Sequence, residues 1–194
     1  MAKSLVLTPG QAKLVDLRRI YRGEIKSVRI DETCKTRVDA AADIVAAAAA
    51  GDDAVYGINT GFGKLANTRI PSSQTAQLQR NLILSHCCGV GDPLPAEIVR
   101  LIIVLKMLSL GRGASGVRWQ LILRLQTLLQ LDMLPVIPSQ GSVGASGDLA
   151  PLAHMTAVLI GAGEVVYQGV VMPAMQALKA AQLEPLELVD HIQS

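Results

Sequence analysis

The residues with the most distinctive chemistry are Ala145-Ser146-Gly147, three small residues inside the glycine-rich stretch 141–154. Glycine and other small residues let a backbone fold tightly on itself. The amide nitrogen of Gly147 can then reach the carbonyl carbon of Ala145, and closure with loss of water makes a five-membered ring. A second dehydration, at Ser146, leaves an exocyclic methylene. The sequence therefore indicates a self-made electrophile, a group that no ordinary side chain supplies well.

A second copy of the same tripeptide provides an internal comparison. Ala114-Ser115-Gly116 lies between two strongly apolar segments with a helical pattern. A bare Ala-Ser-Gly is most often a turn, and we interpret this copy as a helix–helix connection without chemistry. The reactive interpretation of the later copy therefore depends on its surroundings and not on the tripeptide alone.

The segment after the reactive tripeptide is predicted to form a buried helix over 149–163. Asp148 can cap this helix, and Pro151 is tolerated in its first turn. The segment is apolar on nearly every side, although an ordinary core helix has the same pattern. Its N-terminus directs partial positive charge at the Ser146 loop, which helps an electrophile to accept electrons. His154 lies about two helical turns from the loop, and we expect a hydrogen-bonded core histidine there.

A tyrosine on a glycine-rich loop over 55–71 is the second candidate group. Such a loop can close over a site and exclude water. A phenol is a poor base at its ordinary pKa of about 10, but a positive or hydrogen-bonding environment makes phenolate a competent base. The alternative for Tyr56 is a loop residue packed at the edge of the core. Gly63-Lys64 is followed by Leu65, so the phosphate-binding pattern fails and no nucleotide site is expected.

The pair Ser85-His86 lies near the end of an apolar helical segment, where a lone histidine is more often structural. The chain has three cysteines, of which Cys87 and Cys88 are adjacent and rarely pair with each other. The stretch 86–88 also lacks the spacing of a zinc site. We therefore expect reduced thiols and no metal.

Composition predicts one mainly α-helical domain over residues 1–194 with a few short strands. Half of the residues are hydrophobic and only 3% are aromatic, so aliphatic side chains must build the core. The net charge of +2 is dispersed, which argues against nucleic-acid binding. No uncharged apolar run reaches the roughly 18 residues of a membrane span, and no signal peptide is evident, so the cytoplasm is expected. Helices are predicted over 11–21, 31–50, 73–88, 96–110, 117–131, 149–163 and 174–182, with a strand over 24–30 and a hairpin over 164–172.

The whole chain resembles the histidine and aromatic amino-acid ammonia-lyases. Three motifs carry the resemblance in the same order: Tyr56-Gly-Ile-Asn-Thr-Gly-Phe-Gly63, Leu84-Ser-His86, and the stretch 141–154. The resemblance implies the N-terminal part of that family's helical-bundle fold. It implies that 145–147 forms 4-methylidene-imidazol-5-one (MIO) and that Tyr56 removes the β-proton of the substrate. Gly63 and Asp148 are then supporting residues.

The pair at 85–86 implies the substrate within this family. Tyrosine-specific members carry His-Leu there, phenylalanine-specific members carry Phe-Leu, and histidine-specific members carry Ser-His, as in this chain. The resemblance therefore implies that L-histidine is converted to trans-urocanate and ammonia, the first step of histidine degradation. His86 would pair with the substrate imidazole, since each ring can donate and accept one hydrogen bond.

The resemblance also implies a larger assembly. Family members are homotetramers whose sites use several subunits, and a longer C-terminal helical half completes each site. On this comparison the chain is an N-terminal portion that is inactive alone. Two alternatives remain: another MIO enzyme, either a phenylalanine or tyrosine ammonia-lyase or an aminomutase, and a non-catalytic fragment that associates with a complementary chain.

Overall fold

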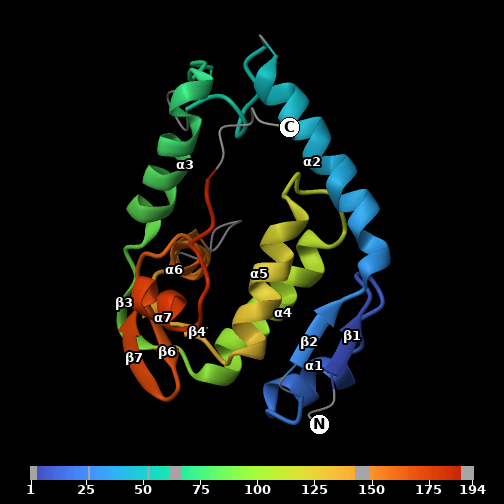
Figure 1. Ribbon diagram of the computed structural model, residues 1–194, viewed down its shortest axis with the longest axis vertical. Helices are drawn as coiled ribbons and strands as arrows, with labels where there is room; N and C mark the ends of the chain where they lie inside the picture. The colour runs from blue at the N-terminus through green and yellow to red at the C-terminus, as the bar shows by residue number, and fades with distance from the viewer. Residues whose placement is uncertain (1–3, 26, 52, 62–66, 143–148, 189–194) are drawn as a thin grey trace.

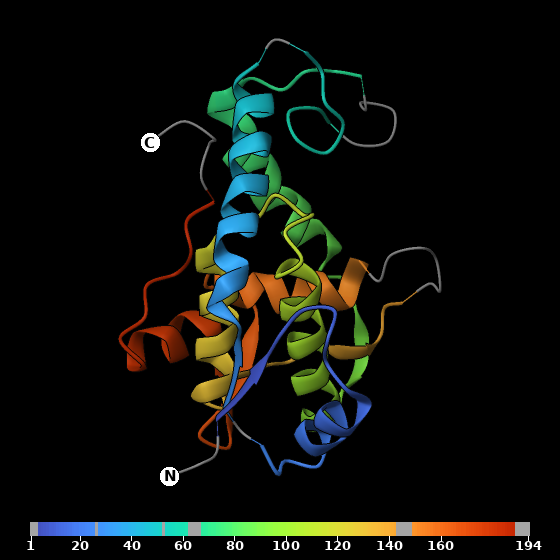
Figure 2. The same ribbon diagram turned by 90° about the vertical axis from the view of Figure 1, so that its right-hand side faces the viewer.

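Four helices set the shape of the protein. The computed structural model describes residues 4–25, 27–51, 53–61, 67–142 and 149–188. Helices α2 (Lys35–Ala50) and α3 (Ser72–His86) approach each other at the top of Figure 1 and separate toward the bottom. Helices α4 (Ala96–Leu110) and α5 (Trp119–Gln130) pack together in the lower half, between these two sides. Figure 2 shows the same division from the side, with α2 and α3 forming the upper part.

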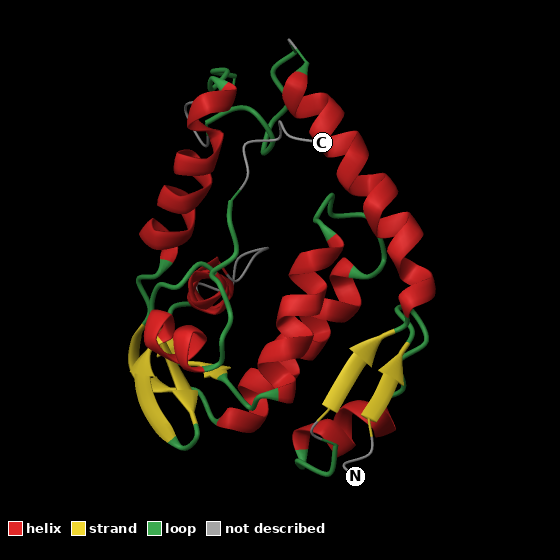
Figure 3. Cartoon of the chain, viewed as in Figure 1, coloured by secondary structure: helices red, strands yellow, loops and turns green. Residues whose placement is uncertain are grey.

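Three small sheets lie at the lower end, on either side of α4 and α5 (Figure 3). Parallel strands β1 (Ser4–Leu7) and β2 (Ser27–Ile30) form one sheet, beside α1 (Leu14–Tyr21). Antiparallel strands β3 (Val90–Pro93) and β5 (Pro138–Gln140) form the second. In the third, β6 (Glu164–Tyr167) pairs antiparallel with both β4 (Leu134–Pro135) and β7 (Val170–Pro173). Helices α6 (Leu149–Leu159) and α7 (Ala174–Ala180) complete the described elements, and α6 packs against α3.

The predicted mainly α fold and its helices are confirmed, and most differences lie at the element ends. Helix α1 begins later than predicted because Gly10 adopts a φ of 84° in a turn before it. Asp31 starts a short 3-10 turn before α2, where its Oδ1 accepts a hydrogen bond from the Thr33 amide at 3.0 Å. Helix α6 ends four residues earlier than predicted, because the chain turns at Gly161 with a φ of 77°.

The predicted hairpin over 164–172 is also confirmed. Gln168 and Gly169 have φ values of 52° and 78°, which suit a two-residue turn between antiparallel strands. Strands β1, β3, β4 and β5 were not predicted. The sequence of β3, Val-Gly-Asp-Pro, has the composition of a turn, and its partner β5 lies far along the chain.

The core is aliphatic, as composition predicts. Helices α4 and α5 contribute fully buried side chains to its centre: Ile103, Met107, Ile122 and Leu128. A buried amide also joins β2 to α5, because Oε1 of Gln126 accepts a hydrogen bond from the Ile30 amide at 2.6 Å. Helices α4 and α5 therefore form the centre of the core against which the elements that carry the predicted site are arranged.

The first Ala-Ser-Gly copy is a helix–helix connection, as predicted. It lies between the end of α4 and the start of α5. Gly116 has a φ of 61°, and a Cβ atom there would lie 2.2 Å from Cγ2 of Val45 on α2. This glycine therefore has a packing role, since it lets the connection approach α2 closely.

Candidate active site

A pocket of about 490 Å³ brings together Tyr56 and His86, two of the described residues that the sequence marks for chemistry. Its wall is largely apolar and comes from α3, α4, α6 and the loop after α2: Leu82, Ile83, Leu149, Leu152 and Ala153. Four polar side chains interrupt this wall: Tyr56, His86, Lys106 and Thr156. An apolar hollow with a few convergent polar groups is typical of small-molecule sites.

A larger pocket of about 620 Å³ lies elsewhere, between α3, α7 and the segment 184–188. None of the predicted site residues lines it. The smaller pocket is therefore the better candidate, because it joins a phenol and an imidazole from separate parts of the chain.

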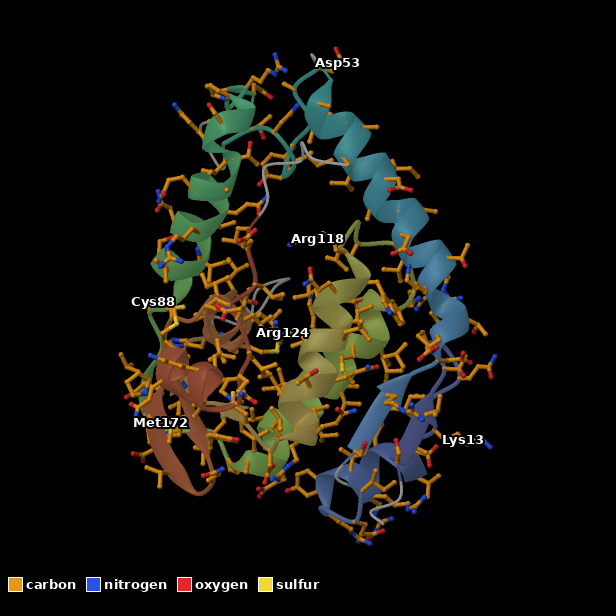
Figure 4. All side chains as sticks on the ribbon, in the orientation of Figure 1. Lys13, Asp53, Cys88, Arg118, Arg124 and Met172 are labelled. Atoms are coloured by element: carbon orange, nitrogen blue, oxygen red, sulfur yellow. The ribbon has the colours of Figure 1, made fainter. Side chains whose placement is uncertain are left out.

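His86 is the last residue of α3, and a hydrogen bond holds its ring in one tautomer. Cys88, two residues further on, is labelled in Figure 4 and shows where this helix ends. Nδ1 of His86 lies 2.7 Å from the carbonyl oxygen of Leu82. A carbonyl only accepts hydrogen bonds, so Nδ1 carries the proton and donates. The neutral ring then has Nε2 available as an acceptor.

Ser85 contacts the imidazole of His86 but does not line the pocket. Its exposed hydroxyl donates to the Leu82 carbonyl at 3.1 Å, and its Oγ lies 3.3 Å from Nδ1 of His86. Two oxygen atoms thus face Nδ1, which favours the Nδ1–H form. Ser85 is absent from the residues that line the pocket, so contact with a substrate stays a prediction for this side chain.

Tyr56 lies on a tight turn at the edge of the pocket. The Ile58 amide donates to the Val55 carbonyl at 3.1 Å, and Gly57 has a φ of 79°. This places Tyr56 at the second position of a turn whose third position favours glycine. Tyr56 is 63% exposed and also lines the pocket, so it is accessible to a small molecule.

The tripeptide Ala145-Ser146-Gly147 lies outside the described residues, as do Asp148 and Gly63. The described flanks still connect it with the pocket. Leu149, which follows Asp148, lines the pocket directly. On the other flank, a Cβ atom on Gly141 would lie 3.0 Å from Cβ of Ala150 and 3.2 Å from Cα of Gly89. The flanks of 143–148 therefore meet beside the end of α3, which fits a reactive group formed next to this pocket.

Two pocket residues were not identified from the sequence. Lys106 is the only formally charged residue in the second half of α4, which is otherwise apolar except for Ser109. An isolated charge of this kind was an available signal. Thr156 gives no such signal, because its hydroxyl donates to the Leu152 carbonyl at 2.7 Å, a common arrangement within a helix.

His154 is hydrogen-bonded within the protein, as predicted, but it is half-buried and not part of the fully buried core. Its Nε2 accepts a hydrogen bond from the Gly89 amide at 3.2 Å. A Cβ atom on Gly89 would lie 3.1 Å from this nitrogen, so the backbone at the end of α3 approaches the ring closely. Burial lowers the pKa of His154 below its ordinary value of 6.5, because desolvation disfavours the charged imidazolium.

We expect His154 to make stability depend on pH. Between the lowered pKa of the folded state and 6.5, the unfolded chain binds more protons at His154 than the folded chain does. The contribution of neutral His154 to the free energy of unfolding is therefore complete above pH 6.5 and is lost as pH falls through the folded pKa. His154→Gln retains an acceptor that does not titrate. Urea unfolding from pH 8 to pH 5 should therefore show a smaller loss of stability for the variant. If the free energy of unfolding changed with pH in the same way for both proteins, His154 would not be a source of the pH dependence.

Comparison with known proteins identifies the class to which this fold and pocket belong. A family model described as aromatic amino acid lyase matches residues 12–191. The chain therefore belongs to the aromatic amino acid lyase family. It is 57% identical over 185 residues to the histidine ammonia-lyase of Bradyrhizobium diazoefficiens, an overlap that covers 95% of this chain and 35% of that relative. The chain thus spans about a third of the curated relative's length, in its N-terminal portion.

Solved structures confirm the predicted ammonia-lyase fold. The ergothioneine-degrading enzyme ergothionase from Treponema denticola aligns with a TM-score of 0.89 and 30% identity, covering 95% of this chain and 37% of that one. Histidine ammonia-lyase from Trypanosoma cruzi aligns with a TM-score of 0.86 and 29% identity, covering 96% of this chain and 36% of that one. In the described part of the chain, no helix has the length and apolarity that a membrane span requires.

Proposed function

We propose that this chain contributes the N-terminal part of a histidine ammonia-lyase, which converts L-histidine to trans-urocanate and ammonia in the first step of histidine degradation. One observation carries the proposal: a single pocket joins Tyr56, His86 and Leu149, the last of which is two residues from Gly147. The 57% identity to the Bradyrhizobium histidine ammonia-lyase supports the choice of substrate.

His86 would bind and orient the substrate ring. Because its Nδ1–H is engaged by the Leu82 carbonyl, its Nε2 accepts a hydrogen bond from an N–H of the substrate imidazole. The apolar wall beside it, including Leu82 and Leu152, excludes water from this contact and so strengthens it. The substrate would thereby be held with its β-carbon toward the rest of the pocket.

Tyr56 would remove the β-proton. This proton is weakly acidic, so the base must be close to the β-carbon and shielded from bulk water. The position of Tyr56 on an accessible turn at the pocket edge suits a base that approaches after the substrate binds. Phenolate is the form that accepts the proton.

The proposed prosthetic group is MIO, formed from Ala145, Ser146 and Gly147. The meeting of the loop's two flanks at Gly141 and Leu149 fits a group at this place. The group supplies an electrophile that draws electron density from the substrate amine, so that ammonia can leave. Asp148 and Gly63 are proposed to support the loop and the tyrosine segment.

We further propose a cytoplasmic homotetramer as the complete enzyme and one domain for 1–194. Support comes from large apolar side chains exposed on several elements, including Ile44, Leu105 and Leu123, which suit burial against further chain or subunits. All three cysteines are free, as expected in a reducing compartment.

The pair Ser85-His86 provides the test of substrate class. We expect Ser85→Phe combined with His86→Leu to lower turnover of L-histidine by about 10²-fold or more, because the substrate imidazole loses its hydrogen-bond partner. Turnover of L-phenylalanine should rise. Since the chain spans about a third of the relative, the assay uses the chain alone and a chimera in which it replaces the matching part of the Bradyrhizobium enzyme.

The control for this test is Ser85→Ala, which retains His86 and its bond to Leu82. It should keep the preference for histidine. Urocanate and cinnamate are followed by their ultraviolet absorbance. An unchanged preference for histidine in the double variant would contradict the assignment of His86. A preference of the unmodified sequence for phenylalanine or tyrosine would favour another MIO enzyme. A chimera without turnover on any amino acid would favour a non-catalytic fragment.

A further inference from the structure

Asn59 is a buried polar residue in the loop that carries Tyr56, and the backbone satisfies its side-chain amide. It is only 2% exposed. Its Oδ1 accepts a hydrogen bond from the Val55 amide at 2.8 Å. Its Nδ2 donates to the Asp53 carbonyl at 2.9 Å and, at 3.4 Å, to the Ala48 carbonyl. A buried group with this many backbone partners fixes local geometry.

Hydrogen bonds join the residues on either side of Tyr56 in the sequence. The Asn59 amide donates to the Val55 carbonyl at 3.2 Å, while the Asn59 side chain accepts from the Val55 amide. The two residues are therefore joined in both directions, and Tyr56 lies on the turn between them. Movement of this turn requires that both bonds break or move together.

The same asparagine ties the turn to the end of α2. Ala48 lies in the last turn of that helix, and Asp53, labelled at the top of Figure 4, follows it. The returning chain is attached to the same place, because the Ile70 amide donates to the Asn59 carbonyl at 2.8 Å and Nη2 of Arg69 donates to the Gly51 carbonyl at 2.8 Å. The base of the tyrosine loop is thus fixed to a long helix.

Only a carboxamide of this size meets these requirements. It supplies an acceptor for the Val55 amide and donors for the two carbonyls. A carboxylate of the same shape keeps the acceptor but places negative charge against the carbonyls of Asp53 and Ala48. We propose that Asn59 is a positioning residue that holds Tyr56 at the pocket. The consequence for proton removal rests on the proposed function of Tyr56.

The test follows Tyr56 by fluorine NMR in the chain labelled with 3-fluorotyrosine. The chain has three tyrosines, Tyr21, Tyr56 and Tyr167, so three signals are expected, and Tyr56→Phe assigns one. Asn59→Asp should move the Tyr56 signal toward its value in urea and leave the other two in place. The matched control is Asn81→Asp, an exposed change on α3 at a side chain that accepts from Gln77, which should leave all three signals unchanged.

The outcomes separate positioning from folding. A Tyr56 signal that stays in place in Asn59→Asp would overturn the proposal. If all three signals move to their values in urea, Asn59→Asp has unfolded the chain, and the Tyr56 signal is measured instead in Asn59→Ser, which adds no charge. Displacement of the Tyr56 signal in that variant supports the proposal, and an unchanged Tyr56 signal overturns the proposal. In the unmodified chain, an unprotected Val55 amide in hydrogen exchange would also overturn the proposal, since Asn59 is its acceptor.

A kinetic measurement extends the test to the reaction. In whichever form turns over L-histidine, Asn59→Asp should lower kcat by about 10²-fold and change KM little, because misplacement of the base affects the proton transfer and not the contact with His86. An unchanged kcat beside a displaced Tyr56 signal would overturn the catalytic part. If no form turns over histidine, the proposed function fails, while the fluorine result still decides whether Asn59 positions Tyr56.

Discussion

Ser146→Ala should abolish the proposed self-made electrophile, and intact mass spectrometry should show this directly. The unmodified sequence should have a mass that is two water molecules short of the calculated value, one lost in ring closure and one from Ser146. The variant has no hydroxyl for the second dehydration, so it should not show the double loss. Turnover of L-histidine by the chimera should fall to background, because none of the described side chains that line the pocket is an electrophile that could activate the amine as a leaving group.

The chain contains its own control for this experiment. Ser115→Ala changes the other Ala-Ser-Gly copy, which connects α4 and α5, and its mass should still fall two waters short. The measurement is repeated in the chimera with the Bradyrhizobium relative, because the surrounding structure must compress the loop for ring closure. A full calculated mass for the unmodified sequence in both forms would contradict the MIO proposal.

In the chimera with the Bradyrhizobium relative, Tyr56→Phe should have the second largest effect, a fall in kcat of about 10²–10⁴-fold, the usual contribution of a general base. Phenylalanine retains the ring at the pocket edge and removes only the hydroxyl, so KM should change little. The loss should appear as a reduced rate of urocanate formation and as a reduced rate of exchange of the β-proton with solvent.

Tyr21→Phe is the matched control for this substitution. Tyr21 is also partly exposed, at 42%, but lies at the end of α1 and away from the pocket, so its loss should leave turnover unchanged. A Tyr56→Phe enzyme with unimpaired kcat would show that another group removes the β-proton. Lys106, which lines the same pocket, would then be the next residue to test.

The sequence alone predicted the helices well, because helical structure depends on nearby residues. Helix α4 has the predicted bounds of 96–110, and the aliphatic core of α4 and α5 follows from apolar spacing along each helix. The hairpin of β6 and β7 was predictable for the same reason, since its turn lies between the two strands. The short strands β3 and β5 were not, because each is stabilised by a partner far along the chain.

The candidate site shows the same division. The motifs marked Tyr56, His86 and the 145–147 tripeptide individually, because their chemistry is a property of residue types and order. The tertiary structure decided that Tyr56, His86 and Leu149 share one pocket and that Lys106 joins them. It also decided which nitrogen of His86 accepts, through the Leu82 carbonyl, and that Asn59 is buried. Distances between residues far apart in the chain depend on how helices pack, and packing is a sum of many weak contacts that no local pattern records.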